Sequence, residues 1–351
     1  GLWLSILFGL IVTPVFFFEP IFLAIGQEPD VAQQAGLYMP LIGLGIIPAL
    51  LVQVLKSYLS ALDLARSILI AVIAAAVMNA CANYVLIFGN FGAPELGIVG
   101  AGIASLVSHT VSLLALAGYA VWKRPEHTLF RNFHRPDPEA LRTVFRVGLP
   151  IGFTLLAETG LFAASSVMMG WLGTIPLAAH GIALQIASLT FMVPLGLSQA
   201  VTVRVGRAWG KNDIPALRAA SQAGMLLAGI AVIATIAAFL LVPEFLIGLF
   251  VDPTDPERPA ILAAGVTLLA VAALFQLVDF GQVMALGMLR GVQDTRVPMI
   301  MAIVSYWGVG LPVGYVLGFP AGLGGVGVWL GLTVGLAAAC ISMQVRFWRR
   351  Y

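Results

Sequence analysis

Charged residues are scarce in this sequence. Asp, Glu, Lys and Arg make up 10% of its 351 residues, whereas hydrophobic residues make up 60%, and the mean hydropathy is +1.00. A water-soluble domain usually carries about 25% charged residues. The few charges here cannot cover a surface that faces water, so a soluble globular class is excluded. We infer that lipid is the main solvent of the chain.

Cysteine is almost absent, and so are the short motifs of common enzymes. The two cysteines, Cys81 and Cys340, lie inside apolar stretches, so we expect packing residues and no disulfide. The patterns GxxxxGK[ST], GxSxG, HExxH and CxxC are missing, and His109 and His180 lack companions at metal-ligand spacing. The sequence therefore argues against an enzyme, an ATP-driven pump, a resident cofactor and a bound metal other than Na⁺.

Long apolar stretches, in contrast, recur along the whole chain. A stretch of about 20 mostly apolar residues crosses the roughly 30 Å hydrocarbon layer as a helix. The alternation typical of outer-membrane barrels is absent. The sequence predicts an all-α polytopic membrane protein with ten spans, at residues 2–25, 36–61, 66–88, 98–122, 142–171, 177–203, 219–242, 259–287, 297–318 and 323–345.

The basic residues indicate how these spans are oriented. If successive helices alternate in direction, every Lys and Arg except Arg258 falls on the same side. The positive-inside rule then places the basic loops and the C-terminus in the cytoplasm, and the protein in the inner membrane of the cell. The net charge of +2 therefore reflects topology, and we expect no nucleic-acid partner.

Short sequence features occur twice and in the same order. The pairs are PIFLAIG (20–26) with PEFLIGL (243–249), an acidic loop at 26–34 with one at 251–259, LDLAR (62–66) with VQDTR (292–296), and LGIVGAG (96–102) with LGGVGVW (323–329). Internal repeats of this kind are typical of secondary transporters. We therefore predict two pseudo-symmetric helical lobes.

The lobes differ in how many spans precede the repeated features. We predict an N-terminal lobe at 1–122 with four helices, a cytoplasmic linker at 123–141, and a C-terminal lobe at 142–351 with six. The second lobe has two further spans before its first repeated feature. We therefore expect that the intact protein has twelve helices and that this chain is truncated at its N-terminus.

Two acidic residues lie deep within predicted spans. Glu158 is twelve residues from Arg146 and Asp279 is eleven from Arg290, which at 1.5 Å per residue is about 18 Å and about 16 Å. Both depths are close to the midplane of the bilayer, where an ionised carboxylate costs at least about 2.5–3.5 kcal/mol. No basic residue is predicted at the same depth. We predict that the two acids meet in a cavity and share one proton or one Na⁺; the alternative is that each only bonds a neighbouring helix.

Polar and aromatic residues accompany Asp279. Gln276 and Gln282 are three residues before and after it, and Phe275 and Phe280 lie beside them. We predict that Phe275 belongs to the cation site and that the other three line a substrate cavity. Amide hydrogen bonds between helices explain the two Gln residues equally well.

Two asparagines share one face of the third span. Asn79 and Asn83 are four residues apart, which aligns their side chains along a helix. Hydrogen bonds to a neighbouring helix are the better explanation for this pair, and a place in the substrate cavity is the second.

The sequence resembles the MATE (multidrug and toxic compound extrusion) family, in its NorM-type branch, over essentially its whole length. The resemblance is carried by NYVLIFG (83–89), GLPIGFTLLAETGLFAAS (148–165), AAHGIALQIASLTFMVPLGLSQAVTVRVGRAWG (178–210) and QLVDFGQVMALGMLRGVQDTRVPM (276–299). It implies twelve helices in two lobes around a central cavity. It also implies export of cationic amphiphilic compounds in exchange for H⁺ or Na⁺, with Glu158 and Asp279 as the cation site of the second lobe.

The chain departs from the family pattern in three places. Phe275 stands where relatives usually have Tyr, and Gly181 stands where Gln is frequent. The acid that the family carries on its first helix falls in the region expected to be missing. A phenylalanine keeps a ring face for a cation but loses a hydroxyl donor, so these departures bear on substrate range and coupling ion.

The hypothesis from the sequence is a monomeric secondary antiporter in the lipid bilayer, with a small cationic substrate and no cofactor besides the coupling ion. One alternative is a flippase for lipid carriers or polysaccharide precursors. It predicts basic residues in the cavity, whereas only Lys56 lies within a span, near a helix end. Another alternative is a membrane sensor or scaffold without transport, which calls for a soluble domain or a long tail.

Overall fold

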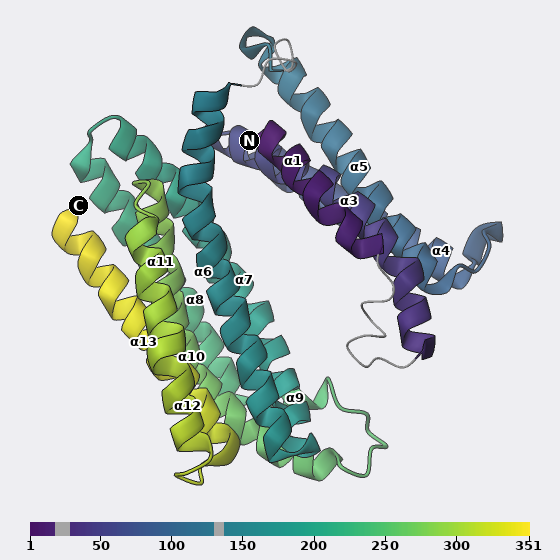
Figure 1. Ribbon diagram of the computed structural model, residues 1–351, viewed down its shortest axis with the longest axis vertical. Coiled ribbons are helices and arrows are strands. Elements are labelled where there is room, and N and C mark those ends of the chain that lie inside the picture. Colours follow the sequence, from purple (N-terminus) through teal and green to yellow (C-terminus); the bar gives the residue numbers. More distant parts are fainter. Residues whose placement is uncertain (18–28, 130–136) are drawn as a thin grey trace. The chain divides into compact units, whose positions relative to one another are not determined.

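The computed structural model describes residues 1–17, 29–129 and 137–351, and within them the chain is helical (Figure 1). Short 3₁₀ turns occur at Thr13–Phe17, Asn90–Gly92 and Pro125–His127. The α-helices are α1 (Leu2–Val12), α3 (Pro29–Ala61), α4 (Ala65–Phe88), α5 (Gly97–Lys123), α6 (Pro138–Leu172), α7 (Thr174–Gly210), α8 (Ile214–Leu241), α9 (Pro243–Gly248), α10 (Arg258–Gly291), α11 (Arg296–Ile303), α12 (Leu311–Gly318) and α13 (Gly324–Arg350).

Nine helical segments in the described part of the chain are long and apolar enough to cross a membrane. They coincide with the nine spans predicted from 36–61 onwards, and α11 and α12 together form one of them, Arg296–Gly318. The first predicted span, 2–25, begins as the shorter apolar helix Leu2–Phe17, and residues 18–28 lie outside the described part. The prediction of an all-α polytopic membrane protein is confirmed.

The chain divides into two compact units, Gly1–Phe145 and Arg146–Tyr351. The division falls inside α6, close to the predicted start of the C-terminal lobe at 142. Residues 130–136 of the predicted linker 123–141 lie outside the described residues. The assignment of the linker and of the lobe boundaries stays a prediction.

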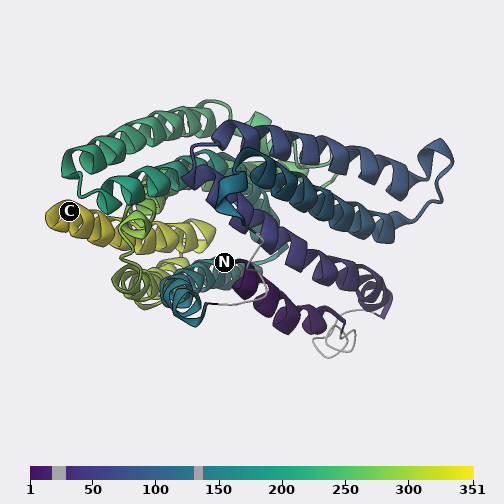
Figure 2. The same ribbon diagram turned by 90° about the horizontal axis from the view of Figure 1, so that it is seen from above.

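In the first unit, α5 packs against both α3 and α4 (Figure 2). Small residues permit this contact: a Cβ atom at Gly100 would lie 2.5 Å from the carbonyl oxygen of Leu86. The buried apolar cluster of the unit is small and consists of Val52, Leu55, Leu59, Leu116 and Ala120.

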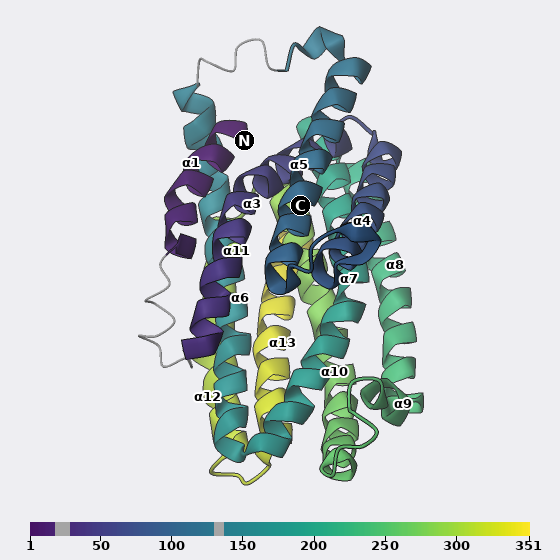
Figure 3. The same ribbon diagram turned by 90° about the vertical axis from the view of Figure 1, so that its right-hand side faces the viewer.

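In the second unit, α10 is the central helix and packs against α7, α8 and α13 (Figure 3). The backbones of α7 and α10 approach closely, because a Cβ atom at Gly287 would lie 2.3 Å from Ser198 Oγ. The hydroxyl of Ser198 donates to the carbonyl of Val283 at 2.7 Å, and that of Thr202 donates to the carbonyl of Gly287 at 2.9 Å. Small residues and hydroxyl hydrogen bonds are typical of helix contacts in membranes.

Turns that the sequence repeat relates have the same backbone conformation. Asp63 and Gln293 each have a φ of 62°, and Gly97 and Gly324, the first residues of α5 and α13, have φ of 53° and 55°. A positive φ is uncommon for residues other than glycine. The repeat therefore extends from the sequence to the backbone of these turns, whereas the repeated feature at 20–26 lies outside the described residues.

The span Arg296–Gly318 changes from α-helix to π-helix at Val304–Gly310, just before Pro312. Proline has no N–H for the carbonyl four residues earlier, and π-helical turns occur frequently at functional sites. The π segment directs Tyr306 into the unit, where it is fully buried. The indole N–H of Trp307 donates to the carbonyl of Ala157 in α6 at 3.1 Å.

Candidate functional site

A cavity of about 190 Å³ in the second unit contains both acids that the sequence placed at mid-membrane depth. Glu158 comes from α6 and Asp279 from α10, and α7 supplies a third side. The other lining residues are Phe162, Leu184, Ala187, Ser188, Phe191 and Phe275. The structure thus brings the two acids together as the depth argument expects, while their binding of a cation stays a prediction.

The two carboxyl groups differ in their access to the cavity. Asp279 is 4% exposed, because α10 is surrounded by other helices over this stretch. Glu158 is half-buried; it follows Ala157, which lies on the buried face of α6 together with Leu161. The arrangement gives one acid deep in the protein and one at the more open side of the same cavity.

Two buried oxygen atoms near Asp279 have no hydrogen-bond partner among the described residues. They are Asp279 Oδ1 and Gln282 Oε1, and the other end of the Gln282 amide donates from Nε2 to the hydroxyl of Tyr306 at 2.7 Å. A buried acceptor without a partner costs about 1–3 kcal/mol. A proton on Asp279 or a small hard cation near these oxygens removes that cost, so the residues present fit either coupling ion.

The described part of the chain gives no support for a metal site built from several side chains. It contains no group of three or more His, Cys, Asp or Glu side chains placed to hold a metal ion. Cys81 and Cys340 are free thiols.

A basic side chain of α10, that of Arg290, lies within electrostatic range of the cavity. Glu158 and Arg290 are close enough for their charges to interact, and Tyr306 also lies within range of Arg290. Side chains on a helix lean toward its N-terminus, which in α10 is the direction of Asp279. Glu158 and Arg290 are not among the ion pairs of the described residues, so the expectation that no basic residue lies at the depth of the acids stays a prediction.

A row of aromatic rings continues from the cavity wall into the core. Phe162 and Phe275 contact each other edge to face, with ring centroids 6.0 Å apart. Phe275 then contacts Trp329 at 5.5 Å, and Trp329 contacts His180 at 5.7 Å. Phe162 lies four residues after Glu158 and so on the same helix face, a signal that the sequence carried. Trp329 belongs to α13, far along the chain from Glu158, so its contact with Phe275 depends on how the helices pack.

His180 holds this row in place through its two ring nitrogens. The indole N–H of Trp329 donates to Nδ1 at 3.1 Å, and Nε2 lies 3.1 Å from the hydroxyl oxygen of Ser166. An indole can only donate, so Nδ1 accepts and Nε2 carries the proton in this network. Ser166 is free to accept because its own hydroxyl donates to the carbonyl of Phe162 at 3.0 Å. His180 is thus a buried packing and hydrogen-bonding residue of the site.

Three residues predicted to line a substrate cavity, Gln276, Phe280 and Gln282, do not line this cavity. Gln276 donates from Nε2 to the carbonyl of Ala187 at 3.0 Å and to the hydroxyl of Thr190, so its amide ties α10 to α7. Phe280 is half-buried and packs against the apolar core. Neither is among the residues that line the cavity, and Gln282 instead faces Tyr306 behind it.

The asparagine pair lies in the first unit, where it connects α4 to α5. Asn83 donates from Nδ2 to Asn79 Oδ1 at 3.0 Å, and Asn79 donates from Nδ2 to the hydroxyl of Ser108 at 3.1 Å. This is the interhelical arrangement that the sequence favoured. Asn79 also lines a separate cavity of that unit.

Comparisons with known proteins agree with these features. The family model described as MatE matches residues 1–85 and 150–316. A probable multidrug resistance protein NorM of Agrobacterium fabrum is 44% identical over 351 residues, which cover 99% of this chain and 75% of that protein. A Pseudomonas putida protein with the same description is 40% identical over 354 residues, covering 99% of this chain and 76% of the relative.

Solved structures with the same architecture are more distant in sequence. A multidrug resistance MATE family transporter of the MOP superfamily, in an outward-facing conformation, superposes with a TM-score of 0.87 over 99% of this chain and 77% of that one. The two sequences are 21% identical, so this likeness concerns the fold alone.

Proposed function

The chain belongs to the MATE family, and from this premise we propose that it is a secondary efflux antiporter. Its substrates are cationic amphiphilic compounds, and it exports them in exchange for H⁺ or Na⁺. The observation that carries the proposal is that Glu158 and Asp279 line one cavity together with aromatic side chains. This combination suits a ligand that is both positively charged and apolar.

The cavity offers separate partners for the two parts of such a substrate. Its charge is attracted by the carboxylates of Glu158 and Asp279. Its apolar body contacts the rings of Phe162 and Phe191, and a cation over an aromatic face gains about 0.5–2 kcal/mol. Phe275, predicted as part of the cation site, also lines the cavity.

Exchange follows if ion and substrate compete for the same carboxylates. A bound H⁺ or Na⁺ neutralises charge at Asp279, where Oδ1 otherwise has no partner, and so weakens the attraction for a cationic substrate. The ion thereby favours the state that has released its substrate, which is the differential affinity any coupling requires. One charge moving through 100 mV supplies about 2.3 kcal/mol, enough for roughly fiftyfold accumulation.

The orientation proposed from the basic residues completes this scheme. With basic loops and the C-terminus in the cytoplasm of a cell whose inner membrane carries a proton or sodium gradient, ion entry drives export. We propose that the protein acts as a monomer, because each lobe supplies its own cavity.

The flippase alternative predicts basic residues around a transported head group. Among the described residues that line the cavity of the second unit there is no Lys, Arg or His. The balance of charge in that cavity therefore favours a cation, whereas the basic residues Lys56 and His109 line a separate cavity of the first unit. The sensor or scaffold alternative gives no reason for two carboxyl groups in one cavity.

The test is export of a fluorescent aromatic cation, ethidium, from cells that lack their own pumps. Glu158→Gln and Asp279→Asn remove one charge each while keeping the size of the side chain. We expect each to lower the initial rate of export by at least about tenfold, the equivalent of ~1.4 kcal/mol. Glu244→Gln, which changes an exposed acid of α9, is the matched control and should export as the wild type does.

Unchanged export by both cavity variants, at equal amounts of protein in the membrane, would reject the proposal. The coupling ion is identified by uptake into proteoliposomes under an imposed Na⁺ gradient or an imposed pH gradient, one at a time. An uptake rate that changes with neither the Na⁺ gradient nor the pH gradient would contradict the proposal of an antiporter.

A further inference from the structure

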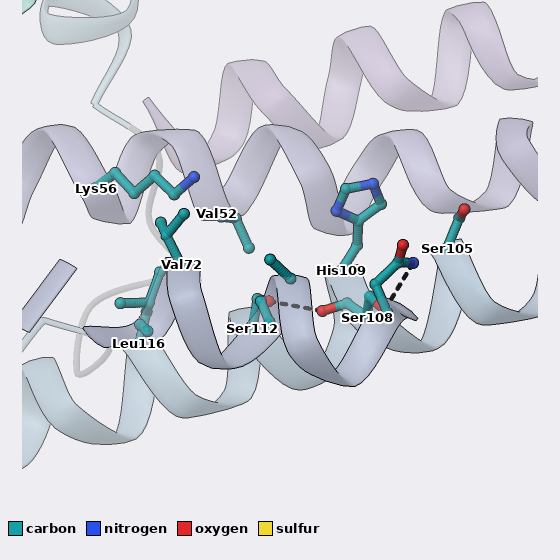
Figure 4. A pocket seen from close by; sticks show the side chains of 12 residues that line it. Val52, Lys56, Val72, Ser105, Ser108, His109, Ser112 and Leu116 are labelled. Atoms are coloured by element: carbon teal, nitrogen blue, oxygen red, sulfur yellow. Dashed lines mark hydrogen bonds between the residues drawn. The ribbon is translucent and has the colours of Figure 1, made fainter. Parts of the chain in front are cut away.

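The first unit contains a second polar cavity, of about 310 Å³, which is half-open and lined by α3, α4 and α5 (Figure 4). Lys56 of α3 and His109 of α5 lie on its wall together with Asn79, Ser105, Ser108 and Ser112, and the rest of the lining is apolar. The volume falls within the range of about 300–1,000 Å³ that is usual for small-molecule sites.

The charged and titratable groups of this cavity are basic. Lys56 is close enough to His109 for its charge to act on the imidazole, and in Figure 4 the Lys56 amine points toward the side on which the His109 ring lies. None of the described residues that line the cavity carries a carboxylate. The electrostatic attraction here is therefore opposite in sign to that of the cavity around Glu158 and Asp279.

Three polar residues of the wall, Asn79, Ser108 and Ser112, already have hydrogen-bond partners within the unit. Ser108 donates to the carbonyl of Ala104 at 2.7 Å and accepts from Asn79. Asn79 Oδ1 in turn accepts from Asn83, and Ser112 donates to the carbonyl of Ser108 at 2.6 Å. The amide oxygen of Asn79 thus already accepts one hydrogen bond, and the titratable groups of the wall carry donors.

Those donors are the ammonium group of Lys56 and the ring of His109. Lys56 lies five residues before the end of α3 at Ala61, about 7.5 Å along the helix, and is half-buried. A charged side chain inside a span is costly unless it faces water or a partner of opposite charge. With no acid on the wall, an anion from outside the unit is the partner that fits.

An apolar cavity adjoins this site. It has a volume of about 90 Å³, shares Ser105 and His109 with the basic cavity, and is otherwise lined by residues such as Leu41, Ile42 and Ile46. A ligand with an anionic end near Lys56 can therefore extend past His109 into apolar surroundings. This pairing of a basic end with an apolar end selects an amphipathic molecule.

We propose that the basic cavity of the first unit binds the anionic group, a carboxylate or a phosphate, of an amphipathic molecule. Lys56 supplies the positive charge and His109 a hydrogen-bond donor. The proposal goes beyond cation exchange at Glu158 and Asp279 and does not depend on it. The anionic group comes either from a free organic acid or from a membrane phospholipid.

Binding is measured on the purified chain in nonionic detergent, by ¹⁹F NMR with 4-(trifluoromethyl)benzoate as the probe. The uncharged 4-(trifluoromethyl)benzamide has the same shape without the charge. We expect the benzoate to bind and the benzamide to bind at least about tenfold more weakly. Lys56→Gln should weaken benzoate binding by a similar factor of about ten, and His109→Gln, which keeps a donor, by about threefold.

Three variants serve as controls. Lys123→Gln changes an exposed lysine of the same unit, whose ammonium lies over the ring of Trp122, and should bind benzoate as the wild type does. Glu158→Gln in the second unit should do the same, which separates this proposal from cation exchange. Lys56→Arg keeps the charge and should retain binding. A melting temperature of Lys56→Gln equal to that of the wild type shows that its loss of binding is not a failure to fold.

The source of the anion is identified in nanodiscs with and without phosphatidate, followed by native mass spectrometry. Phosphatidate retained by the wild type and lost in Lys56→Gln assigns the site to a lipid phosphate. Benzoate binding that phosphatidate does not reduce assigns it to free organic acids. The proposal is overturned if Lys56→Gln binds benzoate as well as the wild type, if the benzamide binds equally well, or if neither anion binds.

Discussion

The two units of this protein contain polar cavities of opposite charge. Two carboxyl groups, Glu158 and Asp279, face aromatic rings in Arg146–Tyr351, whereas Lys56 and His109 face hydroxyls and an amide in Gly1–Phe145. The backbone repeat shows that corresponding turns of the two halves share their conformation. A few side chains on the spans, and not the course of the helices, therefore determine which sign of charge each cavity attracts.

The units also differ in how much of each helix the protein itself covers. In the most apolar stretch of α5, 22% of the residues are buried, whereas 56% are buried in that of α13, its counterpart in the repeat. Lipid tails are as apolar as leucine, so helix contacts in a membrane depend on close packing and hydrogen bonds more than on covering apolar surface. Replacing a small residue at a helix contact should then lower stability most where the helix is most buried.

The largest effect is expected at the contact of α12 with α13. A Cβ atom at Gly331 would lie 2.1 Å from Gly314 Cα, and backbone cannot yield as a flexible side chain does. Gly331→Val should cost more than the ~1–3 kcal/mol of ordinary overpacking and should prevent a monodisperse folded peak in size-exclusion chromatography. Gly118→Val in α5 is the control, because no atom lies within 4 Å of a Cβ atom at this position, and it should elute and melt close to the wild type. Equal elution and melting of the two variants would contradict the expectation that close backbone contacts stabilise the second unit.

The next effect concerns the aromatic row behind the cation cavity. Trp329→Phe keeps a ring but removes the donor to His180 Nδ1, which leaves a buried acceptor unpaired at about 1–3 kcal/mol. We expect the KM for ethidium export to rise several-fold with a smaller change in maximal rate, because Phe275 loses its support. Trp171→Phe removes an exposed indole and is the control. A lower melting temperature with an unchanged KM would limit His180 and Trp329 to a structural role.

A smaller effect is expected at the ion pair that joins the end of α13 to the turn after α10. Arg346 Nε lies 2.7 Å from Asp294 Oδ2, and both side chains are largely buried; the hydroxyl of Tyr351 donates to the same oxygen at 3.3 Å. Arg346→Gln leaves Asp294 with less compensation, at about 1–3 kcal/mol. The thermal midpoint in detergent should fall by a few degrees, and a midpoint equal to that of the wild type would show that Tyr351 alone satisfies Asp294.

The smallest effect is expected at the exposed counterpart in the first unit, where Arg124 and Glu126 lie 3.3 Å apart. The backbone N–H of Glu126, and after it the guanidinium of Arg124, lower the pKa of this carboxyl below its usual value. The resulting stabilisation is present at neutral pH and is lost as pH falls through the lowered pKa. Exposed pairs are screened by solvent and salt, so Glu126→Gln should lower the melting temperature only slightly at neutral pH and not at all at a pH below the lowered pKa. A drop that persists at high salt would contradict this.

Residue counting along single helices was a good guide to this protein, because depth in a bilayer depends on a fixed rise per residue. It placed Glu158 and Asp279 at one level, and the structure puts both on one cavity. Gln276 and Phe280 lie toward α7 and the core and do not line this cavity, so their place in a substrate cavity stays a prediction. A rotation of 100° per residue makes the facing direction sensitive to how neighbouring helices pack.

The sequence by itself determined the solvent of the chain, nine of its ten predicted spans as the described residues show them, and its family, since each depends on hydropathy, spacing or motifs within one stretch. Only the tertiary structure decided that Arg290 acts on Glu158, that His180 supports the aromatic row through Trp329, and that Lys56 shares a cavity with His109. These relations join different helices. They arise from the rotation of each helix about its axis and from the reach of its side chains, which are set when the helices pack together.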